Sequence, residues 1–268
     1  LLLYGAPIYI QPETAPECVD SHVYWHWLAQ RRDVPLVACL KPVQRSVTLI
    51  SSVFRGDDFL VGFLRNSARL QGYADCEHLL IRAASPGNEH EHLVKHVRAH
   101  PGAVYLNLAQ DPGLYAVWNL GVQLATGRFL SNANIDDRRA PEQLLFLQAE
   151  LTRKPEVDVA STALRVSTQK NLDWEASSDC PLLFGNVPDR VYHANALFSD
   201  APKGLSARNL PHCMPLWRRS LHACVGLFDE KRFGPSADWA FWLQAGRHGT
   251  AFTFSARPLG LYLRDEKI

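Results

Sequence analysis

The fold is decided by one continuous stretch, Asp111-Pro-Gly-Leu-Tyr-Ala-Val-Trp-Asn-Leu-Gly-Val-Gln-Leu-Ala-Thr-Gly-Arg-Phe-Leu-Ser-Asn-Ala-Asn-Ile-Asp-Asp137. It ends in three polar side chains, Asn134, Asp136 and Asp137, which follow a predicted strand. Carboxylates at the carboxyl end of a strand suit a hard divalent cation such as Mg²⁺ or Mn²⁺, which also takes phosphate oxygens and water as ligands. The alternative is that the two Asp residues only cap a helix beginning near Pro141.

Strands and helices alternate outward from this stretch in both directions. Strands are predicted over 47–53, 76–81, 104–108, 128–133 and 157–166, and helices over 59–70, 89–100, 114–125 and 141–151. Beyond them we expect a long loop region over 168–212, helices over 216–224 and 236–247, and strands over 251–254 and 259–263. This alternation indicates an α/β fold with a mostly parallel central sheet flanked by helices.

Parallel sheets of this kind bind their ligands beyond the carboxyl ends of the strands. The rule places the expected site in four loops, at 54–58, 83–89, 109–113 and 134–138. The last of these loops carries the carboxylates of the opening stretch.

The 111–137 stretch resembles family 2 glycosyltransferases, in the subgroup that reads D-x-G-(I/L)-Y-(D)-A-(M/W)-N-x-G-I-x-x-A-x-G and then (N/D)-x-D-D. The segments 211–221, 226–230 and 237–243 are similar to the family's H-x-x-x-F-x-R-R-x-L, G-x-F-D-E and (E/A)-D-(W/Y)-D-L-x-L segments, in the same order. The resemblance covers 47–263. It implies a GT-A type nucleotide-diphospho-sugar transferase fold and inverting transfer of a sugar from a nucleotide-diphosphate donor to a hydroxyl acceptor.

The resemblance also implies roles for individual carboxylates. Asp136 matches the last Asp of the metal motif and would bind Mg²⁺ or Mn²⁺, with Asn134 in the first position, where many relatives carry Asp. Asp137 would orient its neighbours. Asp238 matches the catalytic base, and two adjacent tryptophans would partly desolvate it and make it a better base. The alternative for Asp238 is an N-cap of its own helix.

Further positions are implied on the donor side. The residues expected to bind the donor are Ser51, Phe54, Ser85, Asp111, Gly113, Tyr115, Asn119, Asn134, Asp136 and His212. Gly113 would allow a close approach of the backbone, and Tyr115 and Trp118 could line the pocket or belong to the core. His212 would lie near the diphosphate or the acceptor, with a structural role as the alternative.

The sequence departs from the family where the base would be recognised. Relatives commonly carry an Asp after the second strand that reads uracil, whereas this chain has Arg82-Ala83-Ala84-Ser85. Ser85 or Asn88 could take over that contact. A UDP-sugar is the favoured donor. Because the aspartate is replaced, the sequence does not identify the nucleotide base.

Two other groups of charged side chains are expected to be structural. The arginine pair at 138–139 could contact phosphate, but a salt-bridged surface pair is the favoured interpretation. His90, His92, His96 and His100 are expected on the solvated face of the 89–100 helix, where no Cys completes a metal site.

Composition narrows the class of protein without identifying it. The 268 residues are 47% hydrophobic and 21% charged, with a formal net charge of +1, as in an ordinary soluble globular protein. This balance predicts no nucleic-acid partner. Six scattered cysteines are expected to be reduced thiols, and no apolar run is long enough to cross a bilayer. We expect a cytoplasmic location, the inner face of the membrane included.

We expect an N-terminal extension or linker over 1–45, with an aromatic cluster at 24–27, and a GT-A domain over 46–268. The nucleotide-binding half would be 46–140 and the acceptor-binding half 141–268. Because the chain begins with Leu, further domains of a longer protein are expected. The acceptor would be a saccharide or glycolipid, in synthesis of a surface polysaccharide or glycoconjugate.

Two other functions remain open from the sequence. A nucleotidyltransferase would need a glycine-rich, basic phosphate loop after the first strand, which 52–57 lacks. A non-catalytic carbohydrate- or nucleotide-binding module derived from a transferase is consistent with Asn134 and Ala83, whereas the presence of both Asp136 and Asp238 argues against it.

Overall fold

The computed structural model describes residues 45–193 and 209–264 of the chain. The expected extension over 1–45, with its aromatic cluster, lies outside the described residues apart from Arg45. Among the helices that the structure describes, none combines the length and apolar character needed to cross a bilayer. Within the same residues the cysteines are free thiols, at Cys76, Cys180, Cys213 and Cys224.

The described chain divides into two compact units. Unit 1 contains the described residues up to Arg65 together with Gly72–Ile135. Unit 2 contains Asn66–Gln71 together with the described residues from Asp136 onward. The fold is mixed α/β, as the sequence predicts, with a sheet and flanking helices in each unit.

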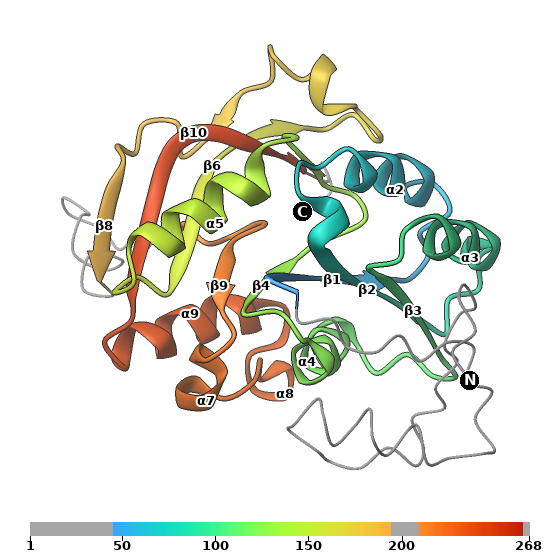
Figure 1. Ribbon diagram of the computed structural model, residues 1–268, viewed down its shortest axis with the longest axis horizontal. Helices are drawn as coiled ribbons and strands as arrows, with labels where there is room; N and C mark the ends of the chain where they lie inside the picture. The colour runs from blue at the N-terminus through green and yellow to red at the C-terminus, as the bar shows by residue number, and fades with distance from the viewer. Residues whose placement is uncertain (1–44, 194–208, 265–268) are drawn as a thin grey trace. The chain divides into compact units, whose positions relative to one another are not determined.

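Unit 1 is built on a parallel sheet with the strand order β3-β2-β1-β4. Its elements are β1 (Val47–Val53), α2 (Leu60–Ala68, whose end belongs to unit 2), a 3-10 turn (Tyr73–Asp75), β2 (Cys76–Ala83), α3 (Glu89–Ala99), β3 (Ala103–Leu108), α4 (Leu114–Leu124) and β4 (Phe129–Asn132). Helices α3 and α4 lie on opposite sides of this sheet (Figure 1). All four predicted strands are confirmed.

The core of unit 1 forms where α4 packs on β1 and β2. Strand β1 is buried along almost its whole length, which suits its β-branched and apolar sequence VTLISSV. Gly121 of α4 lies so close to Ile50 that a Cβ there would overlap the Ile50 side chain, with its Cγ1 3.0 Å away. The missing side chain therefore sets how closely the helix approaches the sheet.

A buried carboxylate fastens the amino ends of β1 and β2. Glu77 accepts hydrogen bonds from the Thr48 hydroxyl at 2.6 Å and from the Thr126 backbone N–H at 2.8 Å. The Thr126 hydroxyl donates to the second oxygen of Glu77 at 3.0 Å. The Thr48 hydroxyl also accepts from the Gly127 N–H at 2.9 Å. This network ties the loop before β4 to the two neighbouring strands.

The histidines of α3 differ from the expectation of a solvated face, because only His92 of the four is exposed. His96 is buried and its Nε2 lies 2.8 Å from the Tyr73 hydroxyl. That hydroxyl is 2.7 Å from His78 Nδ1, and His78 Nε2 is 2.8 Å from the Ser51 hydroxyl. The prediction that His96 is solvated was wrong, because the Tyr73 hydroxyl that binds it comes from another part of the chain and could not be seen in the pattern of the helix.

Unit 2 contains a mixed sheet in which β6 and β10 run parallel and β9, β7, β8 and β5 pair with them antiparallel. Its elements are β5 (Arg138–Arg139), α5 (Gln143–Arg153), β6 (Val159–Ser167), a 3-10 turn (Trp174–Ala176), β7 (Leu182–Leu183), β8 (Arg190–His193), β9 (Leu216–Arg218), α7 (Leu221–Val225), α8 (Glu230–Phe233), a 3-10 turn (Gly234–Ser236), α9 (Ala237–Arg247) and β10 (Ala251–Leu263). Helix α5 runs along β6 and β10 (Figure 1).

Three predictions in unit 2 require correction. The helix expected over 216–224 begins only at Leu221, because Leu216 and Trp217 pair with β6 as strand β9. The strands expected over 251–254 and 259–263 form one strand, β10, with register shifts around Pro258. The loop region over 168–212 includes the short strands β7 and β8.

Asn66–Gln71, the segment that ends α2, is fastened to the beginning of β5 and α5. The Asn66 amide donates to the Arg139 carbonyl and accepts from the Arg139 N–H, both at 2.9 Å. The Gln71 N–H donates to the Pro141 carbonyl at 2.8 Å. These bonds explain why this short segment belongs to unit 2, although unit 1 precedes and follows it in the chain.

Candidate active site

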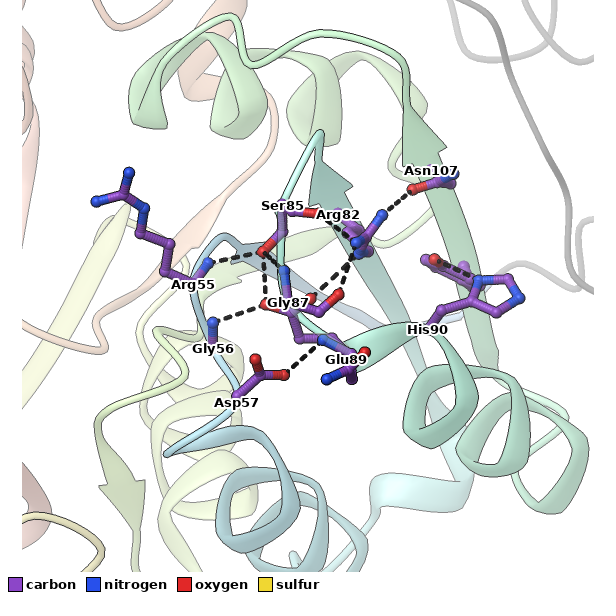
Figure 2. A network of polar contacts seen from close by, with 11 residues as sticks. Arg55, Gly56, Asp57, Arg82, Ser85, Gly87, Glu89, His90 and Asn107 are labelled. Atoms are coloured by element: carbon purple, nitrogen blue, oxygen red, sulfur yellow. Dashed lines mark hydrogen bonds and ion pairs between the residues drawn. The ribbon is translucent and has the colours of Figure 1, made fainter.

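In unit 1, the loops that follow β1 and β2 are joined by one buried carboxylate (Figure 2). Glu89, the first residue of α3, accepts from the Gly56 N–H at 2.8 Å, from the Ser85 hydroxyl at 2.5 Å and from Arg82 Nε at 3.2 Å. Burial by itself raises the pKa of Glu89, but the hydrogen bonds from Ser85, from the N–H groups of Gly56 and Glu89 and from Arg82 together lower its pKa below the ordinary value. Glu89 is therefore a buried anion.

Arg82 lies in the segment 82–85, at the end of β2, where the resembled family commonly carries an aspartate that reads uracil. Its guanidinium points into the protein, where it bonds Glu89, the Asn107 side chain at 3.0 Å and the carbonyls of Ser85 and Gly87 (Figure 2). Every one of these partners belongs to unit 1. Arg82 consequently supports the 84–88 loop from within.

Two residues beside this network have the left-handed backbone conformation that favours glycine. Arg55 follows β1 with φ 50°, and Ala84 follows β2 with φ 46°. Such non-glycine conformations cost about 1–3 kcal/mol and are found preferentially at ligand-binding and active sites. The Arg55 N–H donates to the Ser85 hydroxyl at 2.8 Å, so the strained loop is held by the network.

The predicted base-contacting residues differ in their availability. Phe54 is exposed, with the Arg55 guanidinium 5.2 Å from its ring centroid. Ser51 is fully buried and its hydroxyl is bonded to His78, so its side chain belongs to the core. Ser85 is buried and its hydroxyl is already bonded to Glu89 and Arg55, which leaves the exposed Asn88 as the more accessible of the two proposed substitutes.

The loop before α4 has the local structure that its sequence suggests. Asp111 is exposed and accepts from the Gly113 N–H at 2.9 Å, and Gly113 has φ 96°. Tyr115 and Trp118 are both buried and meet edge-on with ring centroids 5.1 Å apart, so core packing describes them better than a lining role. Asn119 is half-buried on the same helix.

In unit 2, the two adjacent carboxylates of the opening stretch have different environments. Asp137 is buried, accepting from the Cys213 thiol at 3.0 Å and from the Leu263 N–H at 3.1 Å. Asp136 is half-buried, and burial raises its pKa although its own N–H and the charge of Arg138 oppose the rise. Neither caps α5, whose N-cap is Glu142.

The arginine pair at 138–139 is buried, which corrects the expectation of a surface pair. Arg138 donates to the Asp137 carbonyl at 2.7 Å and to the Asn171 side chain at 2.8 Å. Arg139 donates to Gln143 at 2.5 Å, and its backbone pairs with Gly260 of β10. Neighbouring carbonyl and amide oxygens accept hydrogen bonds from both guanidinium groups, which lowers the cost of burying their charges.

Two aromatic side chains connect the surroundings of Asp136 to those of Asp238 within unit 2. Burial, then the charges of Asp137, Cys213 and Asp136, raise the pKa of Tyr262. The Tyr262 ring meets the His212 ring edge-on. Burial lowers the pKa of His212, the charge of Asp238 opposes this and that of Arg264 adds to it. The four residues Asp136, Tyr262, His212 and Asp238 thus form a continuous series of electrostatic neighbours.

Asp238 is half-buried in the first turn of α9, whose N-cap is Ser236, so the capping alternative is excluded. The Asn209 side chain donates to Asp238 Oδ2 at 3.3 Å. Behind it, Trp242 packs edge-on against Trp217 of β9, with ring centroids 5.5 Å apart. Trp217 belongs to the segment 211–221 and Trp242 to the segment 237–243, so two of the segments that resemble the family pack against each other.

The described residues limit how a metal could be held. Among them, no three or more His, Cys, Asp or Glu side chains are grouped so that they could bind an ion. Asp136 offers one half-buried carboxylate, and Asn134, two positions earlier, offers an amide oxygen. A single carboxylate would suit an ion that completes its coordination with diphosphate oxygens and water, and would not suit a permanent structural ion.

The fold is of the GT-A type, as in solved glycosyltransferase structures. The structure is similar to S. aureus TarS 1–349 in complex with UDP, with TM-score 0.63, 14% identity and coverage of 82% of this chain and 60% of that one. It is also similar to the mannosyltransferase PcManGT from Pyrobaculum calidifontis in complex with GDP-Man and Mn²⁺, with TM-score 0.59, 17% identity and coverage of 92% and 65%. No family model and no curated protein matches the sequence.

The chain spans 60% of the TarS 1–349 length and 37% of the longer TarS chain. At these low identities the likeness concerns the fold. The residues that the sequence did not single out are Glu89, Tyr262, Asn209 and Arg264. Tyr262, Asn209 and Arg264 interact with residues that are far away in the sequence, whereas Glu89 bonds the nearby Ser85 and Arg82 as well as the distant Gly56. Only for Asn209, which lies beside the motif segment 211–221, was a signal available in the sequence.

Proposed function

We propose that the protein is an inverting, metal-dependent glycosyltransferase that transfers a sugar from a nucleotide-diphosphate donor to a hydroxyl acceptor. The observation that supports this proposal is the edge-on contact of Tyr262 and His212 in unit 2, because the charge of Asp136 contributes to the pKa of Tyr262 and the charge of Asp238 to the pKa of His212. The GT-A fold supports the same reaction class.

In this proposal Asp238 takes the proton of the acceptor hydroxyl as its oxygen attacks the anomeric carbon. The new glycosidic bond forms as the sugar–phosphate bond breaks, and the nucleoside diphosphate leaves with the bonding electron pair. Asp136, with Asn134, would hold Mg²⁺ or Mn²⁺, which would neutralise the diphosphate. Asn209 donates a hydrogen bond to Asp238 and would control its orientation.

We assign nucleotide binding to unit 1 residues, above all Phe54, Asp111, Gly113 and Asn119. A UDP-sugar is the favoured donor, supported by the UDP complex of TarS. Because PcManGT was solved with GDP-Man, a GDP-sugar is the alternative donor to be tested. The acceptor would be a saccharide or glycolipid of a surface polysaccharide or glycoconjugate. The nucleotide-binding and acceptor-binding halves, further domains and a cytoplasmic location stay predictions.

The deciding experiment measures release of nucleoside diphosphate from UDP-, GDP- and ADP-sugars with a panel of saccharide acceptors, in Mn²⁺ and in chelator. We expect turnover of at least one donor that stops in chelator and returns with Mn²⁺. Turnover that persists in chelator would remove the metal from the proposal while leaving the transferase.

A non-catalytic nucleotide- or carbohydrate-binding module is the second candidate. It is favoured by the single carboxylate at the predicted metal position and by the inward-facing Arg82. The same panel distinguishes the two functions: a module would bind a nucleoside diphosphate in calorimetry and turn over no donor.

A further inference from the structure

We infer that Glu89 and Arg82 are positioning residues of the nucleotide site, which hold the loops after β1 and β2 in place without touching the donor. The inference rests on the proposed function, because it concerns the same site. It begins from the buried position of Glu89, whose carboxylate receives hydrogen bonds from both loops, through Gly56 and through Ser85. A buried anion persists only where such partners satisfy it.

Arg82 provides the second argument. An arginine at the carboxyl end of β2 could extend toward a ligand, but its guanidinium bonds Glu89, Asn107 and the carbonyls of Ser85 and Gly87 (Figure 2). The Arg82 guanidinium therefore donates its hydrogen bonds to acceptors inside unit 1. Arg82 therefore binds the backbone of the 84–88 loop, in the segment where the resembled family commonly carries a base-reading aspartate.

The network also maintains an unusual backbone conformation at the ends of two strands. Arg55 and Ala84 are strained residues at the ends of β1 and β2, and the Arg55 N–H is fixed by the Ser85 hydroxyl. The side chains of Phe54 and Arg55 remain exposed, and Figure 2 shows Arg55 extending away from the network. The network thus presents an aromatic ring and a cation at the carboxyl edge of the sheet, where a nucleotide binds in this fold class.

The structure offers a matched control at the opposite end of β2. Glu77 is also a buried carboxylate that accepts three hydrogen bonds, but its partners Thr48 and Thr126 lie at the amino ends of the strands. Glu77→Gln and Glu89→Gln make the same chemical change in the same unit. Only Glu89→Gln alters the loops at the carboxyl edge.

The test compares the wild-type protein with Glu89→Gln, Glu77→Gln, Arg82→Lys and Arg82→Met. Calorimetry gives the Kd for UDP and for GDP, steady-state assays give donor KM and kcat, and thermal unfolding gives Tm. We expect Glu89→Gln to raise the Kd and donor KM by about tenfold or more, because displaced binding groups lose alignment with the ligand. The kcat should change by less than ~3-fold, as for loss of binding shared by ground and transition states.

Glu77→Gln should lower Tm without changing the Kd, and Arg82→Lys should retain more affinity than Arg82→Met. The inference is overturned if Glu89→Gln folds and binds as tightly as wild type, or if Glu77→Gln loses affinity equally. If Glu89→Gln does not fold, equal affinities of the two Arg82 variants and wild type overturn it. A wild-type protein that binds no nucleotide would overturn the proposed function and this inference together.

Discussion

The ring of His212 meets the ring of Tyr262 edge-on, with their centroids 4.9 Å apart and their planes at 78°. This contact links two regions of unit 2 that are far apart in sequence. The charge of Asp136, after burial and the charges of Asp137 and Cys213, contributes to the raised pKa of Tyr262. The charge of Asp238 opposes the lowering of the His212 pKa by burial. The contact therefore supports the proposal that the two carboxylates belong to one reaction site.

Asp238→Asn is expected to lower turnover by at least ~10²-fold, because a carboxamide cannot accept the acceptor's proton. Binding of nucleoside diphosphate, measured by calorimetry, should stay close to wild type. Asp229→Asn is the matched control, since Asp229 caps α8 through the Arg232 N–H at 3.1 Å and has no proposed chemical role. Wild-type turnover in Asp238→Asn would remove Asp238 from the mechanism.

Asp136→Ala is expected to weaken donor binding in Mn²⁺ by about tenfold or more, because the ion loses its one protein carboxylate. In chelator the variant and the wild type should bind the nucleoside diphosphate alike. Asp179→Ala, in an exposed loop of unit 2, serves as the control for loss of a negative charge. An unchanged Mn²⁺ titration in Asp136→Ala would contradict the assignment.

The stability of unit 1 is expected to fall on mild acidification because of His96. Burial, and then the charge of His100, lowers the pKa of His96 to about 4. The unfolded chain takes up this proton near pH 6.5, whereas the folded chain resists it, so stability is lost as pH falls from about 6.5 toward 4. Between pH 7 and pH 5 the loss from this group is about 2 kcal/mol.

Urea unfolding followed at both pH values measures this loss. His96→Gln should make the unfolding free energy less sensitive to pH, while His92→Gln, on the exposed side of the same helix, should leave the sensitivity unchanged. An equal pH response in His96→Gln and wild type would show that another group is responsible.

Gly121→Ala is expected to destabilise the protein by about 1–3 kcal/mol, the usual range for overpacking in a core. In an exposed helix the same change would stabilise by up to about 1 kcal/mol. Here the added Cβ would meet Ile50, and that clash outweighs the helix propensity. In an Ile50→Ala background, which lacks the clashing γ carbons, Gly121→Ala should cost less, as measured by chemical denaturation.

Periodicity and strand composition predicted the parallel sheet of unit 1 and helix α9 because those elements have local signals. Strand β9 has none: Leu216–Arg218 is too short to show alternation, and its pairing with β6 determines its conformation. The prediction has two strands, over 251–254 and 259–263, where the structure has the single strand β10, which continues past Pro258 through shifts in register.

The candidate site shows the same limit more clearly. The positions of Asp136 and Asp238 could be proposed from motifs, but the burial of Arg138 depends on Asn171, which lies 33 positions later in the chain. Likewise, Ser85 looked available for base contact until the structure showed its hydroxyl bonded to Glu89. Polar partners that meet only after folding leave no periodic trace in the sequence.

The excursion of Asn66–Gln71 into unit 2 has a practical consequence for anyone who wishes to divide this protein. A fragment starting at Asp136 would lack the amide that satisfies both backbone groups of Arg139, and the Pro141 carbonyl would lose its donor. In that fragment the backbone N–H and carbonyl of Arg139 in β5 would lose their hydrogen-bond partner. A chimaera that takes unit 2 from this protein therefore also needs the segment Asn66–Gln71, so that residue 66 can bond the backbone of residue 139.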